Sequence, residues 1–280
     1  MRRLVSLAIA FLAVAACGGG LLTDATTPAP RSPSTTTAPT TTPAPVSSTT
    51  TAAPVTVTTA PATVASEAGP LELLTTDLIG PSGTLVARAS DEVDVYERPG
   101  DLEPARILEA TTIVGTPTVL AVLEGPAQGW ARVLVPGRPS GAQGWVETGD
   151  MSLFVVHGEL LVDLSDKTLR YLENGVEIVS TMVAIGSDRN PTPTGSFFVT
   201  DNVTLANPDS PWGPHALGLS ARSETITEYN GGDGIIGIHG TDQPESIGDA
   251  ISLGCVRVPN EVITRLHELV EVGTPVTITA

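Results

Sequence analysis

The stretch 234–257, GIIGIHGTDQPESIGDAISLGCVR, contains the pattern that determines the fold and the chemistry of this chain. Its first residues are apolar and rich in β-branched side chains, which predicts a buried strand that ends at His239. A short segment downstream contains Ser252, Gly254, Cys255 and Arg257. Histidine titrates near neutral pH and a thiol is a strong nucleophile once deprotonated, so His239 and Cys255 together predict nucleophilic catalysis.

The residues of this stretch predict separate roles in that chemistry. An ordinary thiol is only slightly ionised at neutral pH, so Cys255 as nucleophile needs His239 as its base. Consecutive amides around Gly254 and Cys255 are candidates for an oxyanion hole. Arg257 leaves the same face as Cys255 if that segment is extended, and its guanidinium suits a substrate carboxylate. A structural salt bridge explains Arg257 equally well, and a small buried core residue remains an alternative for Cys255.

Two motifs carry a resemblance to a known family. His239-Gly240-Thr241 followed by Ser252-Leu253-Gly254-Cys255-Val256-Arg257 resembles the catalytic signature of the YkuD-type L,D-transpeptidases, and Thr192-Pro193-Thr194-Gly195 resembles a turn of the same family. The chain departs from many members at Leu253, where histidine or lysine is common. The resemblance implies a YkuD-type β-sandwich with one C-terminal helix over residues 153–280. It also implies that Cys255 and His239 are catalytic and that substrate binding or oxyanion stabilisation involves Arg257, Gly254, Ser252, Gly240 and Thr241.

The same resemblance implies a reaction. Cys255 would attack the third-residue carbonyl of a peptidoglycan stem tetrapeptide, release D-alanine and form a thioester, which the side-chain amine of another stem resolves into a cross-link. No cofactor is expected, and carbapenems would acylate the same thiol. An L,D-carboxypeptidase that uses water, or a catalytically idle wall-binding lipoprotein, remain alternatives. A papain-like protease is disfavoured because its cysteine precedes its histidine, and scattered histidines disfavour a metal site.

The rest of the segment 153–280 is predicted to be mainly β. Asn174-Gly175 lies between two strand-like runs, as a tight hairpin turn requires. A helix is expected over residues 261–270, with Asn260 as its N-cap. Residues 201–229, rich in Pro, Gly and Asn, are expected to form a long loop that roofs the site. The histidines at 157, 215 and 267 are expected at a domain junction, in that loop and on the helix, and none is expected to be catalytic.

Residues 83–151 show short β-rich runs broken by Gly and Pro, which predicts a small β-barrel. The pairs Gly129-Trp130 and Gly144-Trp145 resemble bacterial Src-homology-3-like modules, where a turn glycine precedes a core tryptophan. We expect these tryptophans to be core residues rather than a ligand platform.

The N-terminal part is expected to be a leader and a spacer. Residues 1–16 resemble a signal peptide, and Val14-Ala15-Ala16-Cys17 resembles a lipobox in which Cys17 is lipidated; an ordinary signal peptide with a chance cysteine is the alternative. Residues 17–82, rich in Thr and Pro, predict a disordered stalk, with or without a mechanical role. The catalytic part would then be held outside the membrane, facing the wall. With Cys17 lipidated, Cys255 would have no disulfide partner.

The charge balance bears on partners. The chain has 14 Lys and Arg against 31 Asp and Glu, a net charge of -17. Phosphate binding needs clustered positive charge, so a nucleic-acid partner is disfavoured.

Overall fold

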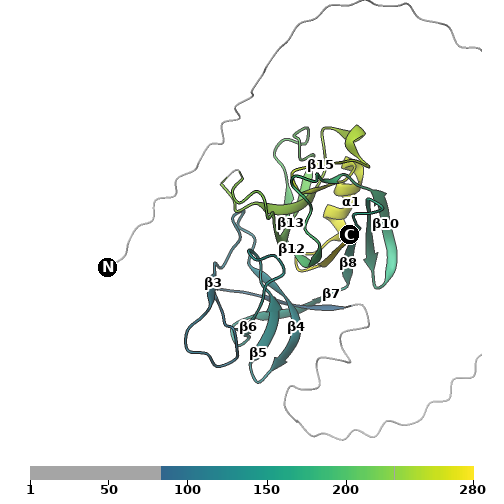
Figure 1. Ribbon diagram of the computed structural model, residues 1–280. Helices are drawn as coiled ribbons and strands as arrows, with labels where there is room; N and C mark the ends of the chain where they lie inside the picture. The colour runs from purple at the N-terminus through teal and green to yellow at the C-terminus, as the bar shows by residue number, and fades with distance from the viewer. Residues whose placement is uncertain (1–82, 230) are drawn as a thin grey trace, which may run out of the picture. The chain divides into compact units, whose positions relative to one another are not determined.

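The computed structural model describes residues 83–229 and 231–280, which form two β-sheet modules with one α-helix, α1 (Asn260–Leu269) (Figure 1). The expected mainly β fold with one C-terminal helix is therefore confirmed. The predicted signal peptide at 1–16, the lipidation site Cys17 and the stalk at 17–82 lie outside the described residues. In the part of the chain that the structure describes, no helix has the length and apolar composition of a membrane span.

The first module is built on an antiparallel sheet of five strands in the order β6-β5-β4-β1-β7. Its strands are β1 (Thr84–Arg88), β4 (Val119–Ala127), β5 (Trp130–Leu134), β6 (Gln143–Glu147) and β7 (Ser152–Val156), and β2 (Val93–Val95) pairs with β3 (Arg106–Leu108) beside it. The pairings described do not join β6 to β7, so the predicted barrel is not confirmed. Strand β7 pairs with β1 along its whole length and ends at Val156, and β8 of the second module begins at Gly158. The chain therefore passes from the first module to the second at His157.

The core of the first module consists mainly of valine and alanine rather than tryptophan. Trp130 and Trp145 are only half-buried, so the expectation that they form the core is wrong. Trp130 instead packs edge-to-face against Tyr96, with ring centroids 5.3 Å apart. Small valine and alanine side chains fill the space between the strands in place of the indole rings.

The second module is one mixed sheet of eight strands, in the order β10-β9-β8-β17-β12-β13-β14-β16. Its strands are β8 (Gly158–Asp163), β9 (Thr168–Glu173), β10 (Val176–Met182), β12 (Gly195–Thr204), β13 (His215–Arg222), β14 (Ile235–His239), β16 (Val256–Arg257) and β17 (Pro275–Thr279). A separate pair joins β11 (Ile185–Gly186) to β15 (Ala250–Ser252), and a 3-10 turn, η1, spans Pro244–Ser246. The C-terminal strand β17 lies between β8 and β12 and so connects the two halves of the sheet.

The β9–β10 hairpin forms where the sequence predicts it. Asn174 and Gly175 have φ angles of 50° and 76°, the left-handed pair that a two-residue hairpin turn requires. Glycine adopts this conformation without a steric penalty, and Asn tolerates it better than most residues.

Two sequence expectations about this module are wrong. Residues 201–229 are not one long loop, because they contain the end of β12 and the whole of β13, which is buried between β12 and β14. His215 is accordingly the first residue of β13. Asn260 is the first residue of α1 rather than its N-cap, which is Pro259. The Asn260 side chain instead accepts a hydrogen bond from the Thr241 amide at 2.7 Å.

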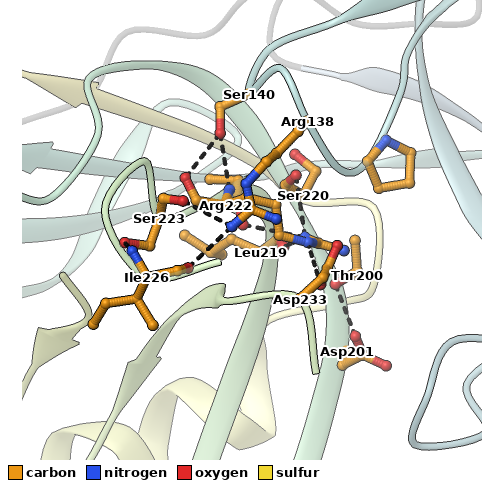
Figure 2. A network of polar contacts seen from close by, with 12 residues as sticks. Arg138, Ser140, Thr200, Asp201, Leu219, Ser220, Arg222, Ser223, Ile226 and Asp233 are labelled. Atoms are coloured by element: carbon orange, nitrogen blue, oxygen red, sulfur yellow. Dashed lines mark hydrogen bonds and ion pairs between the residues drawn. The ribbon is translucent and has the colours of Figure 1, made fainter. Parts of the chain in front are cut away.

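The two modules share side chains through β12. Successive strand residues point to opposite faces, so Phe197 packs in the core of the second module and Phe198 in the core of the first. Polar contacts join the same two modules: Ser140 Oγ donates to the Arg222 carbonyl at 3.0 Å and accepts from the Arg222 amide at 2.8 Å (Figure 2). Arg138 donates to the carbonyls of Ser223 and Ile226 in the same network.

Phe198 is fully buried, so its truncation should destabilise the protein strongly. We expect Phe198→Ala to lower the free energy of unfolding by about 3–5 kcal/mol, measured by denaturant titration, because it removes a large buried ring and leaves a cavity. Phe154→Ala is the matched control, since Phe154 is only partly buried against the same core, and should cost less. Equal losses of unfolding free energy in the two variants would contradict the packing of Phe198 in the core of the first module.

Candidate active site

His239 and Cys255 are brought together by a short parallel pairing. Strand β14 pairs with β16 through Ile238 opposite Val256 and His239 opposite Arg257. Cys255 directly precedes β16, and a backbone hydrogen bond from Gly237 places its thiol beside the middle of β14. His239, Cys255 and Arg257 all line one cavity of about 290 Å³. The predicted nucleophile, base and arginine thus share a single site.

The His239 ring is held in one tautomer. It is 5% exposed, and its Nδ1 lies 2.6 Å from the carbonyl oxygen of Gly240. A carbonyl oxygen only accepts hydrogen bonds, so Nδ1 carries the proton and Nε2 keeps its lone pair. Burial lowers the pKa of His239 to about 4, with the charge of Arg257 acting in the same direction and the Gly240 hydrogen bond opposing it. At neutral pH the ring is therefore uncharged and able to accept a proton.

An aromatic stack covers His239. The Trp212 ring stacks on the imidazole with centroids 4.9 Å apart and an angle of 21° between the planes, and Tyr229 stacks on Trp212 with centroids 6.5 Å apart. Trp212 and Tyr229 also line the cavity, so the segment 201–229 does contribute to its walls. Sequence reasoning did not identify these two aromatic residues.

The Cys255 thiol is neutral in the resting site. Burial raises its pKa, while a backbone hydrogen bond from Gly237 and the charge of Arg257 lower it in part. The uncharged imidazole can take the thiol proton when substrate is bound, which is general-base catalysis. The alternative, a thiolate and an imidazolium already formed in the free enzyme, does not fit these two pKa shifts.

Arg257 has no carboxylate partner in the part of the chain that the structure describes. Its Nη1 lies 3.5 Å from Gln243 Oε1, and its buried Nε has no hydrogen-bond partner. Three ion pairs occur among residues 83–229 and 231–280, and none includes Arg257. The guanidinium therefore lies in the cavity without a neutralising charge.

The loop before Cys255 is supported from two sides. Thr192 Oγ1 accepts from the Gly186 amide at 2.8 Å and donates to the Gly254 carbonyl at 2.9 Å. Ser252 Oγ donates to the Cys255 carbonyl at 2.6 Å and accepts from the Gly254 amide at 3.1 Å. Gly254 has a φ of 116°, a backbone conformation that strains any residue with a side chain, and a Cβ there would lie 2.9 Å from Ile236 Cδ1.

These bonds bear on the predicted oxyanion hole. The Gly254 amide already donates to Ser252, which argues against its use as an oxyanion donor and leaves the Cys255 amide as the candidate. Ser252 lines the cavity, whereas Gly240 and Thr241 do not. Gly240 packs against Asn260, and the buried Thr241 accepts from the Gln243 amide, so both residues support the turn after His239.

The other histidines do not line the cavity. His215 and His267 stack on each other with centroids 4.0 Å apart, and His157 lies between β7 and β8. Within the described residues, no three His, Cys, Asp or Glu side chains gather as metal ligands would.

Comparison with known proteins identifies the second module. Residues 157–278 match the family model described as YkuD, L,D-transpeptidase catalytic domain. The chain is 32% identical over 143 residues to the YkuD protein of Bacillus licheniformis, covering 51% of this chain and 78% of that protein. It is 33% identical over 125 residues to the YkuD protein of Bacillus subtilis, and the match covers 45% of this chain and 68% of that protein.

Solved structures were also found. A crystal structure of an Enterococcus faecium L,D-transpeptidase mutant has 28% sequence identity and a TM-score of 0.34, with 44% of this chain matched to 49% of that one. This chain thus spans about half the length of that structure.

The reactivity of Cys255 should show its raised pKa. We expect the rate of alkylation by iodoacetamide to keep rising with pH through and beyond the ordinary thiol value of 9.0, because only the thiolate reacts. Arg257→Gln should slow alkylation at any one alkaline pH, since it removes a charge that favours the thiolate. Peptide mapping would separate the adduct at Cys255 from one at Cys17. An alkylation rate that levels off near neutral pH would contradict an uncharged Cys255 thiol beside an uncharged His239.

Proposed function

The chain belongs to the YkuD family of L,D-transpeptidases, and on that premise we propose that it cross-links peptidoglycan stem peptides between their third residues. The observation that supports this most strongly is the single cavity that holds an uncharged His239, a protonated Cys255 and an unpaired Arg257. These are the groups that acyl transfer through a thioester requires.

The proposed reaction has two halves. His239 Nε2 takes the thiol proton while Cys255 Sγ attacks the third-residue carbonyl of a stem tetrapeptide. The peptide bond then breaks, and His239 returns the proton to the amine of the leaving D-alanine. In the second half, the side-chain amine of another stem attacks the thioester, His239 accepts its proton, and the thiol is restored as the new amide forms.

Arg257 would hold the substrate in this reaction. Its uncompensated charge faces the cavity, where the terminal carboxylate of D-alanine would pair with it. The absence of an acidic partner for Arg257 in residues 83–229 and 231–280 favours this role over a structural salt bridge. The Cys255 amide would stabilise the oxyanion, and carbapenems would acylate the same thiol.

Removal of the base should slow both halves of the reaction. We expect His239→Ala to lower turnover of tetrapeptide roughly a hundredfold to ten-thousandfold, with products measured by chromatography and mass spectrometry. His215→Ala is the matched control, because His215 is a second histidine of the same sheet that lies outside the cavity. The parent should yield cross-linked dimer; tripeptide alone would identify a carboxypeptidase, and no product would identify an idle site.

We also propose that the protein is a lipoprotein outside the cytoplasmic membrane. The support is the sequence Val14-Ala15-Ala16-Cys17 after an apolar run, followed by the Thr- and Pro-rich residues up to 82, which would act as a spacer toward the wall. The Src-homology-3-like character of the first module belongs to the same proposal and rests on its two Gly-Trp pairs.

Lipid attachment at Cys17 can be tested in cells. Cys17→Ser should block maturation and leave a larger precursor, visible by gel mobility and by the loss of lipid label from the protein. Cys255→Ser should mature as the parent does. A Cys17→Ser protein that is processed and fractionates like the parent would exclude the lipid anchor.

A further inference from the structure

A hairpin loop of the first module reaches the active-site cavity. Residues 111–117 form this loop, which is closed by a β-bridge between Thr111 and Pro117. At its tip, Ile113 and Val114 line the same cavity as Cys255 and are 72% and 57% exposed. Two large apolar side chains are thus exposed in the cavity that also contains the nucleophile, where a bound substrate would cover them.

The loop is held firmly in place. The Thr112 amide donates to the Thr116 carbonyl at 2.8 Å, and the Gly115 amide donates to the Thr112 carbonyl at 2.9 Å. Thr112 Oγ1 also donates to Asp201 Oδ1 at 2.5 Å, across to β12 of the second module. Asp201 is 5% exposed and accepts a second bond from Thr200 (Figure 2). The tip is therefore a preformed wall of the cavity.

The tip and Arg257 lie toward opposite ends of β14. Ile113 packs against Gly232, just before β14, because its Cδ1 lies 3.2 Å from the position of a Cβ on Gly232. Arg257 pairs with His239 at the other end of the strand, and the Cys255 thiol lies at Gly237 between them. A strand of this length spans about 13 Å, which matches an extended peptide of about four residues.

From this geometry we propose that Ile113 and Val114 bind the acyl-donor stem peptide on the N-terminal side of its scissile bond. The inference rests on the proposed function. With the carboxylate of the leaving residue on Arg257, the acyl part of the donor runs along β14 toward the loop. The methylene groups of its third residue, the residue that carries the side-chain amine, suit the aliphatic tip. The first module therefore supplies specificity-determining residues to the active site of the second.

The test compares two variants of the full chain. Ile113→Ser with Val114→Ser should lower kcat/KM for tetrapeptide about tenfold, chiefly through KM, because apolar contacts to the donor are lost. Iodoacetamide alkylation of Cys255 and the melting temperature should stay at parent values. The control is Leu102→Ser, at a position of the same module that is 95% exposed and lies outside the cavity. It should leave kcat/KM, the alkylation rate and the melting temperature unchanged. Ile113→Leu with Val114→Leu should retain tetrapeptide turnover.

The outcomes separate this inference from the function on which it rests. If the parent is acylated by tetrapeptide and the double serine variant reacts equally well, the loop does not bind the donor and the proposed function stands. A parallel loss of alkylation would also overturn the inference, since it would show a general disturbance of Cys255. If the parent itself forms no acyl-enzyme with tetrapeptide, the proposed function fails and the inference fails with it.

Discussion

The two-residue pairing of β14 with β16 is the constraint on which the site depends. It sets His239 opposite Arg257 and places Cys255 beside Gly237 of β14. His239 is buried and Cys255 is half-buried, and both stay uncharged because desolvation lowers the pKa of His239 and raises the pKa of Cys255. Arg257 then supplies the one positive charge of the group, which favours the thiolate and leaves the imidazole free to accept its proton.

So short a pairing needs support from elsewhere. Thr192 bonds the Gly254 carbonyl, and Ser252 bonds both ends of the Gly254–Cys255 segment, so the loop before the nucleophile cannot shift easily. On the other side, Asn260 bonds the Thr241 amide and holds the turn after His239. These polar side chains act on backbone groups, which explains why several residues of the two motifs lie near the reaction without lining the cavity.

The local part of this arrangement could be predicted from the sequence, and the non-local part could not. Strand runs and the Asn174-Gly175 turn follow from local preferences, and the cysteine and histidine could be paired from their chemistry. Strand β13 was missed because its burial comes from its neighbours β12 and β14 rather than from its own pattern. Asn260 has a cap-like position, but a tertiary hydrogen bond to Thr241 uses its side chain. Trp212 and Ile113 reach the cavity only through the fold, and no spacing rule connects them to Cys255.

The most direct test of the account is the mass of the enzyme trapped during turnover of a stem tetrapeptide. If Cys255 is the nucleophile and His239 its base, acid-quenched parent should carry one tripeptide acyl group, lost on treatment with hydroxylamine and mapped to the peptide that contains Cys255. An acyl group on another residue, or the same adduct on Cys255→Ala, would contradict the mechanism.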